Sequence, residues 1–404
     1  MRQQCVVFIE SNTTGSGIEI IKKTQELELV PIVLARNPKL YPEIMMLCQV
    51  VLCETNCWDT LEKQLLTLQQ HYELLGVMST SEYYMETVSK VCAQFNLPSN
   101  PVATINVCRH KYQLRQLLAH HGFPQPDFFI ANNIEDFESQ LDGIKFPLVI
   151  KPVSESGSLN VKLCTSKEEA TALAMMILEK RINIRHQKVD NAVLCESFIA
   201  GQEYSIETFA DGAEIKCIGI TEKKVSGAPY FVETGHIFPA DLDGDTQKLI
   251  EETVVKALKL VGNRFGAMHT EIKLDQGRVY IIEINPRLAG GMIPQILKHA
   301  TGIDLLENWL LATCNLPLDL QPKQKKISQI TFITSAKSGI FKGIEFHDGL
   351  KEFEKKVIYQ IGKEVKIPTS FYDRLGYVIS TATSYEEIAN QIEKIASGVR
   401  VTIA

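Results

Sequence analysis

The stretch that decides the fold is Met268–Met292, which reads M-H-T-E-I-K-L-D-Q-G-R-V-Y-I-I-E-I-N-P-R-L-A-G-G-M. It contains two runs rich in apolar and β-branched residues, Met268–Leu274 and Val279–Ile284. Between them stands Asp275-Gln276-Gly277, a turn sequence that typically joins antiparallel strands. The stretch therefore predicts a β-hairpin.

This hairpin is expected to gather polar side chains on one face of its sheet. If the loop has three residues, Glu283 faces His269 and Glu271 faces Ile281. Side chains that lie opposite one another, and those two residues further along, share a face. The polar members of that face are then Glu271, Glu283, Asn285 and His269. A two-residue loop would shift the register by one and separate the two glutamates.

Two carboxylates and an amide oxygen on one face favour a bound cation. The carboxylates of Glu271 and Glu283 would repel each other among Ile, Val and Tyr residues unless a positive charge neutralised them. Mg²⁺ that bridges nucleotide phosphates prefers such oxygen ligands, so we predict a metal site at Glu271, Glu283 and Asn285, with Mn²⁺ as a second candidate ion. Solvated glutamates on an exposed face are the alternative.

Upstream motifs supply groups suited to a nucleotide. The strand-like Phe146–Lys151 ends in a lysine, a compact cation suited to phosphate. It is followed by the Ser154–Ser158 loop, whose small residues let backbone N–H groups approach phosphate oxygens. In Glu196–Ile199 the backbone can face an adenine edge, and Glu203 can accept hydrogen bonds from ribose hydroxyls. Each motif alone is common in ordinary loops and strands.

In this order and spacing over Lys111–Met292, the motifs resemble those of the ATP-grasp superfamily. The resemblance implies an ATP-grasp fold, α/β and α+β multidomain, with an N-terminal Rossmann-like domain before it. It places a second nucleotide lysine at Lys111, near the α- and β-phosphates. The implied ATP-binding residues are Lys111, Lys151, Ser154, Gly157, Ser158, Glu196, Phe198, Ile199 and Glu203.

A narrower resemblance is to the L-amino acid ligases, which join two unprotected amino acids. It is carried by Tyr230–Pro239, by the preceding Glu222-Lys223-Lys224, and by the spacing from Arg287 to Gly290. The resemblance implies an ADP-forming carboxylate–amine ligase. A carboxylate attacks the γ-phosphate of ATP to give an acyl phosphate, and an amine then displaces phosphate.

Arg287 is the predicted catalytic cation. Its planar fork can hold a carboxylate or a phosphate with two hydrogen bonds, and charge develops on such groups during acyl transfer. Gly290 and Gly291 lack side chains and permit close approach of the backbone to substrate. A surface ion pair of Arg287 is the alternative.

Glu233 and His236 are the other predicted substrate residues. The resemblance places both beside the amino acid, where Glu233 can pair with an ammonium group. A neutral His236 could accept the proton that the ammonium must lose before it attacks, which makes His236 a predicted catalytic residue. In the alternative interpretation, Glu233 is a structural partner of Lys223 or Lys224, and His236 only fills a hydrogen-bonding position.

The sequence as a whole predicts four regions. The first two are an N-terminal α/β domain (1–100) and a central region with the nucleotide lysines and phosphate loop (101–192). The last two are a region with the adenine hinge and metal site (193–320) and a small C-terminal α+β segment (321–404). The first region alternates strand-like and helix-like stretches, typical of a parallel sheet. Its Gly15-Ser16-Gly17 more closely fits a tight turn than a nicotinamide site, because it lacks the third glycine and the acidic residue of that motif.

The composition favours a small-molecule enzyme. The 404 residues carry 42 Lys and Arg against 48 Asp and Glu, a net charge of −6, and no broad basic run suited to nucleic acid. No stretch approaches the roughly 20 apolar residues of a membrane span. The 10 scattered cysteines indicate thiols in a reducing compartment, with a zinc site as the alternative. We expect a cytoplasmic protein, and a homodimer stays open.

Two rival functions remain at this stage. One is a biotin-dependent carboxylase subunit or a purine-pathway ligase on the same scaffold, against which the Glu233-x-x-His236 motif argues. The other is a regulatory protein that binds nucleotide without turnover, against which the intact set of metal ligands and Arg287 argues.

Overall fold

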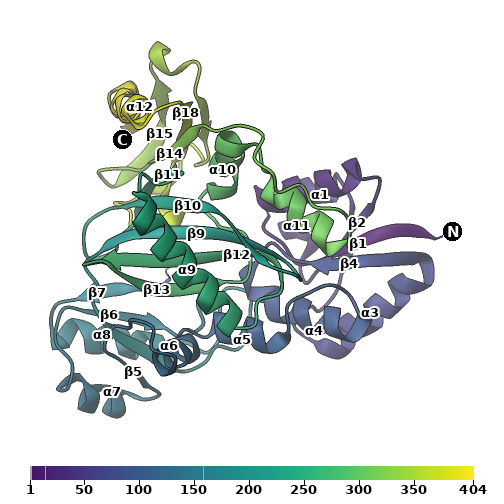
Figure 1. Cartoon of the computed structure of the whole chain (residues 1–404), viewed down its shortest axis with the longest axis horizontal. Helices are drawn as coiled ribbons and strands as arrows, with labels where there is room; N and C mark the ends of the chain where they lie inside the picture. The colour runs from purple at the N-terminus through teal and green to yellow at the C-terminus, as the bar shows by residue number, and fades with distance from the viewer. Residues whose placement is uncertain (1, 14, 158) are drawn as a thin grey trace.

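The computed structural model describes residues 2–13, 15–157 and 159–404, which form four β-sheets and the helices around them (Figure 1). The mixed α/β and α+β architecture agrees with the expected multidomain class. Within the described residues, no helix is long and apolar enough to cross a membrane.

The N-terminal region is a parallel sheet in the order β3-β2-β1-β4, with helices on both faces. Its elements are β1 (Gln3–Ile9), α1 (Ser16–Glu26), β2 (Val30–Ala35), α2 (Pro42–Met45), β3 (Gln49–Leu52), α3 (Trp58–His71), β4 (Tyr72–Met78) and α4 (Met85–Phe95). The strand residues Cys5–Ile9 are fully buried, as expected for a sheet covered on both sides. A Cβ on Gly17 would lie 1.7 Å from the carbonyl oxygen of Asn12, so the tight turn itself requires this glycine.

The central region is an antiparallel four-stranded sheet in the order β5-β8-β6-β7. Its elements are α5 (Val102–Arg109), α6 (Lys111–His120), β5 (Phe128–Ala131), α7 (Ile134–Leu141), β6 (Leu148–Pro152), β7 (Lys162–Cys164), α8 (Lys167–Glu179) and β8 (Val193–Ser197). The side chain of His110 accepts a hydrogen bond from the Gln113 N–H and caps α6, so Lys111 opens this helix as expected. Because β8 pairs with β5 and β6, this sheet extends past the expected division between 192 and 193.

The third region is built on an eight-stranded sheet in the order β13-β12-β9-β10-β11-β14-β18-β16. Its first strands are β9 (Gln202–Asp211), β10 (Ile215–Val225), β11 (Glu233–Phe238), β12 (Phe265–Asp275) and β13 (Arg278–Asn285). The helix α9 (Gly244–Leu260) crosses one face of these strands (Figure 1) and buries Ile206, Ile272 and Ile284 with its own apolar side. The polar residues of the strands therefore lie on the opposite face.

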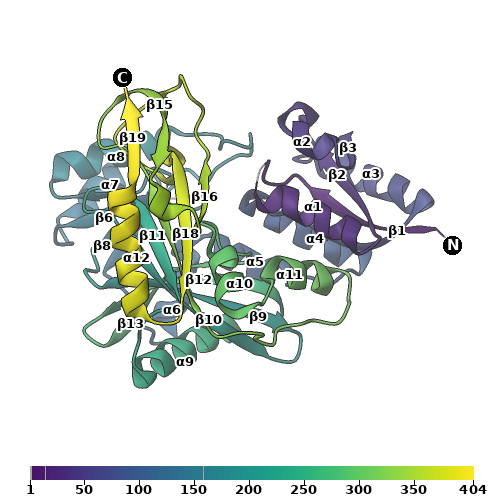
Figure 2. The same cartoon turned by 90° about the horizontal axis from the view of Figure 1, so that it is seen from above.

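The C-terminal segment continues this large sheet. Three of its strands, β14 (Ile327–Ile333), β16 (Glu354–Val357) and β18 (Gly376–Ala382), extend the sheet beyond β11. The helix α12 (Tyr385–Gly398) lies alongside β18 (Figure 2). The remaining elements are α10 (Ile293–Thr301), α11 (Leu305–Thr313), β15 (Gly339–Phe346), β17 (Glu364–Val365) and β19 (Val399–Ile403).

The hairpin β12–β13 differs in register from the prediction. Asp275 pairs with Arg278, and Gln276 and Gly277 both have positive φ, so the turn has two residues rather than three. A β-bulge between Glu271 and Ile272 then shifts the register once more. As a result Glu271 lies directly opposite Glu283, not opposite Ile281, and His269 lies opposite Asn285. The four polar residues still share one face.

Candidate active site

The predicted metal ligands lie on the polar face of the large sheet and are balanced by lysines. The ammonium of Lys111 lies 3.1 Å from the Glu283 carboxylate, and Asn285 donates a hydrogen bond of 2.8 Å to the same carboxylate. Burial raises the pKa of Glu283, but Lys111, Asn285 and Arg287 together hold it below its usual range. Burial likewise raises the pKa of Glu271, but Lys223, 3.0 Å away, and His269 together hold it below its ordinary value.

The donor chemistry of this face fits Mg²⁺. Two ionised carboxylates directly across the strands, with the amide oxygen of Asn285 beside them, offer the hard oxygen ligands that this ion prefers. Among the described residues, no three His, Cys, Asp or Glu side chains are already arranged as a metal site. Lys111 and Lys223 instead neutralise Glu283 and Glu271.

The buried imidazole of His269 contacts Glu271, one of the predicted metal ligands. His269 Nδ1 lies 2.8 Å from Glu207, and its Nε2 lies 3.2 Å from Glu271. Burial lowers the pKa of His269, but Glu207 and Glu271 together raise it to about 9. The imidazolium therefore orients Glu271 at neutral pH.

Lys223 is the centre of a cluster of carboxylates. Its ammonium lies 2.7 Å from Glu203, 2.9 Å from Glu233 and 3.0 Å from Glu271. The side chain is buried, and the three carboxylates raise its pKa well above the ordinary value despite desolvation. One cation thus connects the predicted ribose, substrate and metal carboxylates. Of the two lysines offered as structural partners of Glu233, Lys223 makes that contact.

His236 is buried and neutral, but it is a weak base. Its ring packs edge-on against Phe332 with 5.5 Å between centroids, and neither ring nitrogen has a hydrogen-bond partner among the described residues. Desolvation lowers the pKa of His236 to about 3, although Glu233 opposes this shift. The expected neutral state agrees with this environment, whereas acceptance of a substrate proton does not, because a general base works best with a pKa near the working pH.

Gly291 lies against this histidine. It has a positive φ of 58°, and a Cβ there would lie 2.6 Å from His236 Nε2 and 3.6 Å from a Glu233 carboxylate oxygen. Only glycine fits this position, for both conformational and steric reasons. The loop that carries Arg287 and Gly290 is thereby held beside Glu233 and His236.

On the nucleotide side, Glu196 lies between two cations. Lys151 Nζ is 2.6 Å and Arg115 Nε is 2.5 Å from its carboxylate, and all three side chains are buried. Burial raises the pKa of Glu196, but Arg115 and Lys151 lower it to about 2. Arg115 also donates to the carbonyl of Ile281, so this helix residue connects the hinge to the metal strand β13. The sequence analysis did not identify Arg115.

The predicted adenine hinge, Glu196–Ile199, is in contact with an aromatic residue and a lysine from other strands and loops. Phe198 stacks on Phe231 with 5.4 Å between centroids, and Lys273 Nζ lies 4.7 Å from the Phe198 centroid. Lys273 also donates to the Ile199 carbonyl at 3.0 Å, and the Phe198 N–H donates to Pro147. Because the Ile199 carbonyl and the Phe198 N–H already have these partners, adenine would have to bind other backbone groups of the Glu196–Ile199 segment.

The predicted phosphate loop is fixed by groups from distant parts of the chain. Lys111 Nζ donates to the Glu155 carbonyl at 3.0 Å, and Ser156 Oγ donates to Glu82 at 2.6 Å. Gly157 has a φ of 71°, and a Cβ there would lie 2.5 Å from the ring of Phe371. Ser158 lies outside the described residues. The carbonyl of Ser154 accepts a hydrogen bond of 3.4 Å from Arg109.

Arg287 forms a buried ion pair rather than a surface one. Its Nη2 lies 2.5 Å from the carboxylate of Glu82, which comes from the N-terminal region, and Arg109 lies 3.3 Å from the same carboxylate. Burial raises the pKa of Glu82, but Arg287 and Arg109 hold it below its ordinary value. Glu82 was missed in the sequence, although it follows the carboxyl end of β4, the edge where open α/β sheets place functional residues.

A second guanidinium reaches the site from the C-terminal segment. Arg374 Nη2 lies 2.8 Å from Glu233, and its guanidinium carbon lies 3.5 Å above the centre of the Phe332 ring. Desolvation lowers the pKa of Arg374, and Glu233 opposes the shift. No sequence motif marks Arg374, and the sequence analysis did not name it.

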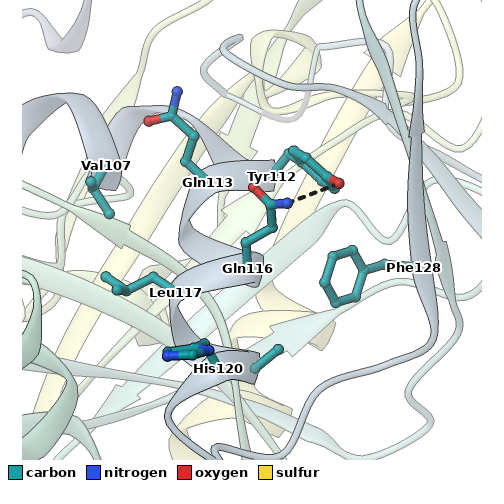
Figure 3. Close-up of a pocket in the computed structure, with 8 residues that line it drawn as sticks. Val107, Tyr112, Gln113, Gln116, Leu117, His120 and Phe128 are labelled. Atoms are coloured by element: carbon teal, nitrogen blue, oxygen red, sulfur yellow. Dashed lines mark hydrogen bonds between the residues drawn. The ribbon is translucent and has the colours of Figure 1, made fainter.

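One hollow in the structure lies apart from the predicted site. It has a volume of about 710 Å³ and is lined by the outward side of α6, including Tyr112, Gln116, His120 and the nearby Phe128 (Figure 3). Lys111, at the start of the same helix, reaches Glu283 on the polar face of the large sheet. The hollow thus contains none of the predicted site residues.

Comparisons with known proteins match parts of the chain to two families. Residues 144–295 match the ATP-grasp domain family, and residues 331–404 match the L-amino acid ligase C-terminal domain 2 family. An uncharacterized protein of Sinorhizobium fredii is 27% identical over 100% of this chain and 84% of its own length. The alanine–anticapsin ligase of Bacillus amyloliquefaciens is 30% identical over 59% of this chain and 54% of its own length, so the match spans about half of that relative.

Several solved structures share the fold over the whole chain. The L-amino acid ligase from Bacillus licheniformis superposes with a TM-score of 0.82 at 22% identity, covering 100% of both chains.

Proposed function

We propose that the chain is an ATP-grasp carboxylate–amine ligase that joins two amino acids into a dipeptide, with ATP converted to ADP and phosphate, because parts of it match the ATP-grasp domain family and the L-amino acid ligase C-terminal domain 2 family. The observation that carries the proposal is the contact of Gly291 with His236 and Glu233. It brings the loop of Arg287, a cation suited to an acyl phosphate, next to a carboxylate suited to an ammonium group.

ATP would bind between the two sheets. In this proposal Lys111 and Lys151 contact its phosphates beneath the 154–158 loop, and Glu196–Ile199 and Glu203 receive adenine and ribose. The ion pairs of both lysines support these roles, since each lysine is held in a buried, charged state and can release its carboxylate to a phosphate.

Glu271, Glu283 and Asn285 would hold Mg²⁺, as their donor chemistry supports. The bound ion would neutralise charge on the nucleotide phosphates. The ammonium of Lys111 would then move from Glu283 toward phosphate oxygens. The ammonium of Lys223 would remain with Glu203 and Glu233.

The reaction has two steps. A carboxylate oxygen of the first amino acid attacks the γ-phosphorus, the bond to the β-phosphate oxygen breaks, and ADP leaves. The neutral amine of the second amino acid then attacks the acyl carbon, the C–O bond to phosphate breaks, and hydrogen phosphate leaves with one amine proton. Arg287 would stabilise the anionic acyl phosphate and the tetrahedral intermediate.

The amine must first lose the extra proton of its ammonium form. With its pKa lowered to about 3, His236 would not hold this proton at neutral pH. We therefore assign it the role of a neutral hydrogen-bonding group at the amine site, and the bound ammonium would lose its proton to solvent before the amine attacks.

A phosphate-release screen over pairs of amino acids and small carboxylic acids, with mass spectrometry of the products, tests this proposal. We expect ADP and a dipeptide in equal amounts, and only when both amino acids are present. ADP release that strictly requires bicarbonate would favour a carboxylase-like or purine-pathway enzyme. ATP and Mg²⁺ binding without phosphate release for any pair would favour a regulatory nucleotide-binding protein.

A further inference from the structure

Arg374 stands at the junction of the C-terminal segment and the predicted amine site. It follows the short helical turn Phe371–Asp373 and precedes β18, within the region that matches the L-amino acid ligase C-terminal domain. Its side chain is 7% exposed, whereas that of its partner Glu233 is 28% exposed. The carboxylate of this ion pair is thus the more accessible end.

Arg374 and His236 both carry unused hydrogen-bonding atoms in this place. In the part of the chain that the structure describes, Arg374 Nε and both ring nitrogens of His236 are buried without a hydrogen-bond partner, and His236 Nε2 lies 3.7 Å from the Glu233 carboxylate. Both side chains pack on the same ring, Phe332. Buried polar atoms without hydrogen bonds are unfavourable, so a cluster of them marks a place where a polar ligand or water can bind.

The other cations of the site already form ion pairs elsewhere. Lys223 already neutralises three carboxylates, and Arg287 pairs with Glu82 on the side proposed for the acyl phosphate. Arg374 has a single carboxylate partner, Glu233, on the side proposed for the amine. It is therefore the cation of this side that can best accept a second anion.

An α-amino acid is a zwitterion whose two charges complement this ion pair. Resting on the proposed function, we propose that Arg374, together with His236, binds the carboxylate of the amino acid whose amine attacks, while Glu233 takes its ammonium group. The ion pair between Glu233 and Arg374 is then exchanged for two ion pairs with the substrate, and no net charge enters the buried site.

The surroundings support an anion at this point. Helix α10 begins at Ile293, two residues after Gly291, which lies against His236 Nε2. The N-terminal end of a helix carries partial positive charge. A neutral His236 can donate one N–H to a carboxylate oxygen, and Arg374 can donate in parallel from its guanidinium.

The proposal defines the substrate class of the second site. The amine donor must be an amino acid with a free carboxylate, and amino acid amides, esters and simple amines should be poor substitutes. The C-terminal segment, through Arg374, would set this requirement.

The test compares three nucleophiles with one acyl donor: an amino acid, its carboxamide, and hydroxylamine, which traps an acyl phosphate as a hydroxamate. The wild-type protein should prefer the amino acid over its amide. Arg374→Gln should raise the KM for the amino acid on the order of 100-fold and reduce the preference over the amide by a similar factor. Arg374→Lys should recover part of the preference, because it restores the charge without the fork.

Two controls keep the outcome interpretable. Arg400→Gln changes an exposed arginine of the same segment and should behave like the wild type, and thermal melting of each variant reports on folding. Equal losses with amino acid, amide and hydroxylamine in a folded Arg374→Gln would overturn the proposal, as would a wild-type enzyme that uses amide and amino acid equally well. Absence of any hydroxamate in the wild type would instead contradict the proposed function itself.

Discussion

Two ionic centres of opposite composition each contain residues of the predicted ATP site, Glu196 in one and Glu203 in the other. Around Glu196, two cations, Lys151 and Arg115, surround one carboxylate, which leaves a surplus of one positive charge. Around Lys223, three carboxylates surround one ammonium, which leaves a surplus of two negative charges before Arg374 is counted.

The difference teaches what each centre is suited to bind. A cation-rich centre favours an anion, and the nucleotide phosphates are the anion that the motifs around Lys151 predict. A carboxylate-rich centre favours cations, and both a divalent metal and a substrate ammonium are cations. Internal ion pairs neutralise part of the charge at each centre, and ligands of the opposite sign to the surplus can replace or complete them.

The largest effect is expected from the carboxylate-rich centre. Glu271→Gln removes a predicted metal ligand and should lower ATP-dependent phosphate release by at least about 10³-fold. The rate is measured with saturating ATP and both amino acids. Glu252→Gln, an exposed change on α9, serves as the matched control. Retained ADP formation in Glu271→Gln would refute the metal assignment.

The carboxylate-rich centre can also be disrupted by removing its cation, Lys223. Lys223→Gln leaves the partly buried carboxylates of Glu203, Glu233 and Glu271 without their shared partner, and breaking the ion pairs of a buried side chain such as Lys223 costs about 3–5 kcal/mol. We expect the free energy of unfolding in urea to fall by that amount, whereas exposed Lys248→Gln should leave it nearly unchanged. A Lys223→Gln variant as stable as the wild type would show that the three carboxylates do not depend on this ammonium.

The cation-rich centre should respond to pH instead. The pKa of Glu196 lies near 2 in the folded protein, below its unfolded value, so its contribution to stability is complete above about pH 4.5 and fades as the pH falls toward 2. Glu196→Gln should therefore lower the Tm by several degrees at pH 7. The difference in Tm between variant and wild type should shrink between pH 4.5 and pH 3. A constant difference over that range would argue against an ionised Glu196.

The smallest effect is expected at the hinge between the two centres. Lys273→Met removes the contacts of the ammonium with Phe198 and with the Ile199 carbonyl. Since such contacts contribute about 1 kcal/mol, the KM for ATP should rise roughly five-fold with little change in kcat. A loss confined to kcat would place Lys273 at the reacting groups instead.

The metal face was predictable from the sequence, but its register was not. Side chains alternate between the two faces of a strand. Any register that places Glu271 and Glu283 on one face therefore also places Asn285 and His269 there. A three-residue loop was expected, and the two-residue turn with the bulge beside Glu271 reaches the same face by a different pairing. The bulge could not be foreseen, because two one-residue shifts in the same direction add up to two residues, keep the same side chains on one face and leave no trace in the spacing of the motifs.

The residues missed by the sequence analysis share a physical reason. Glu82, Arg115 and Arg374 act through tertiary contacts with partners far away along the chain, at Arg287, Glu196 and Glu233. Glu82 could have been flagged by its place after a parallel strand. Arg115 lies within an ordinary amphipathic helix and Arg374 in a polar turn, so nothing local distinguishes either from a solvated arginine.

The central claim, that a carboxylate is activated by the γ-phosphate at this site, is tested most directly with an acyl-donor amino acid labelled with oxygen-18 in its carboxylate. We predict that the phosphate released during dipeptide formation carries one labelled oxygen, transferred when the acyl phosphate breaks down. Unlabelled phosphate accompanied by dipeptide, or ATP hydrolysis that leaves the label in the free amino acid, would contradict the account.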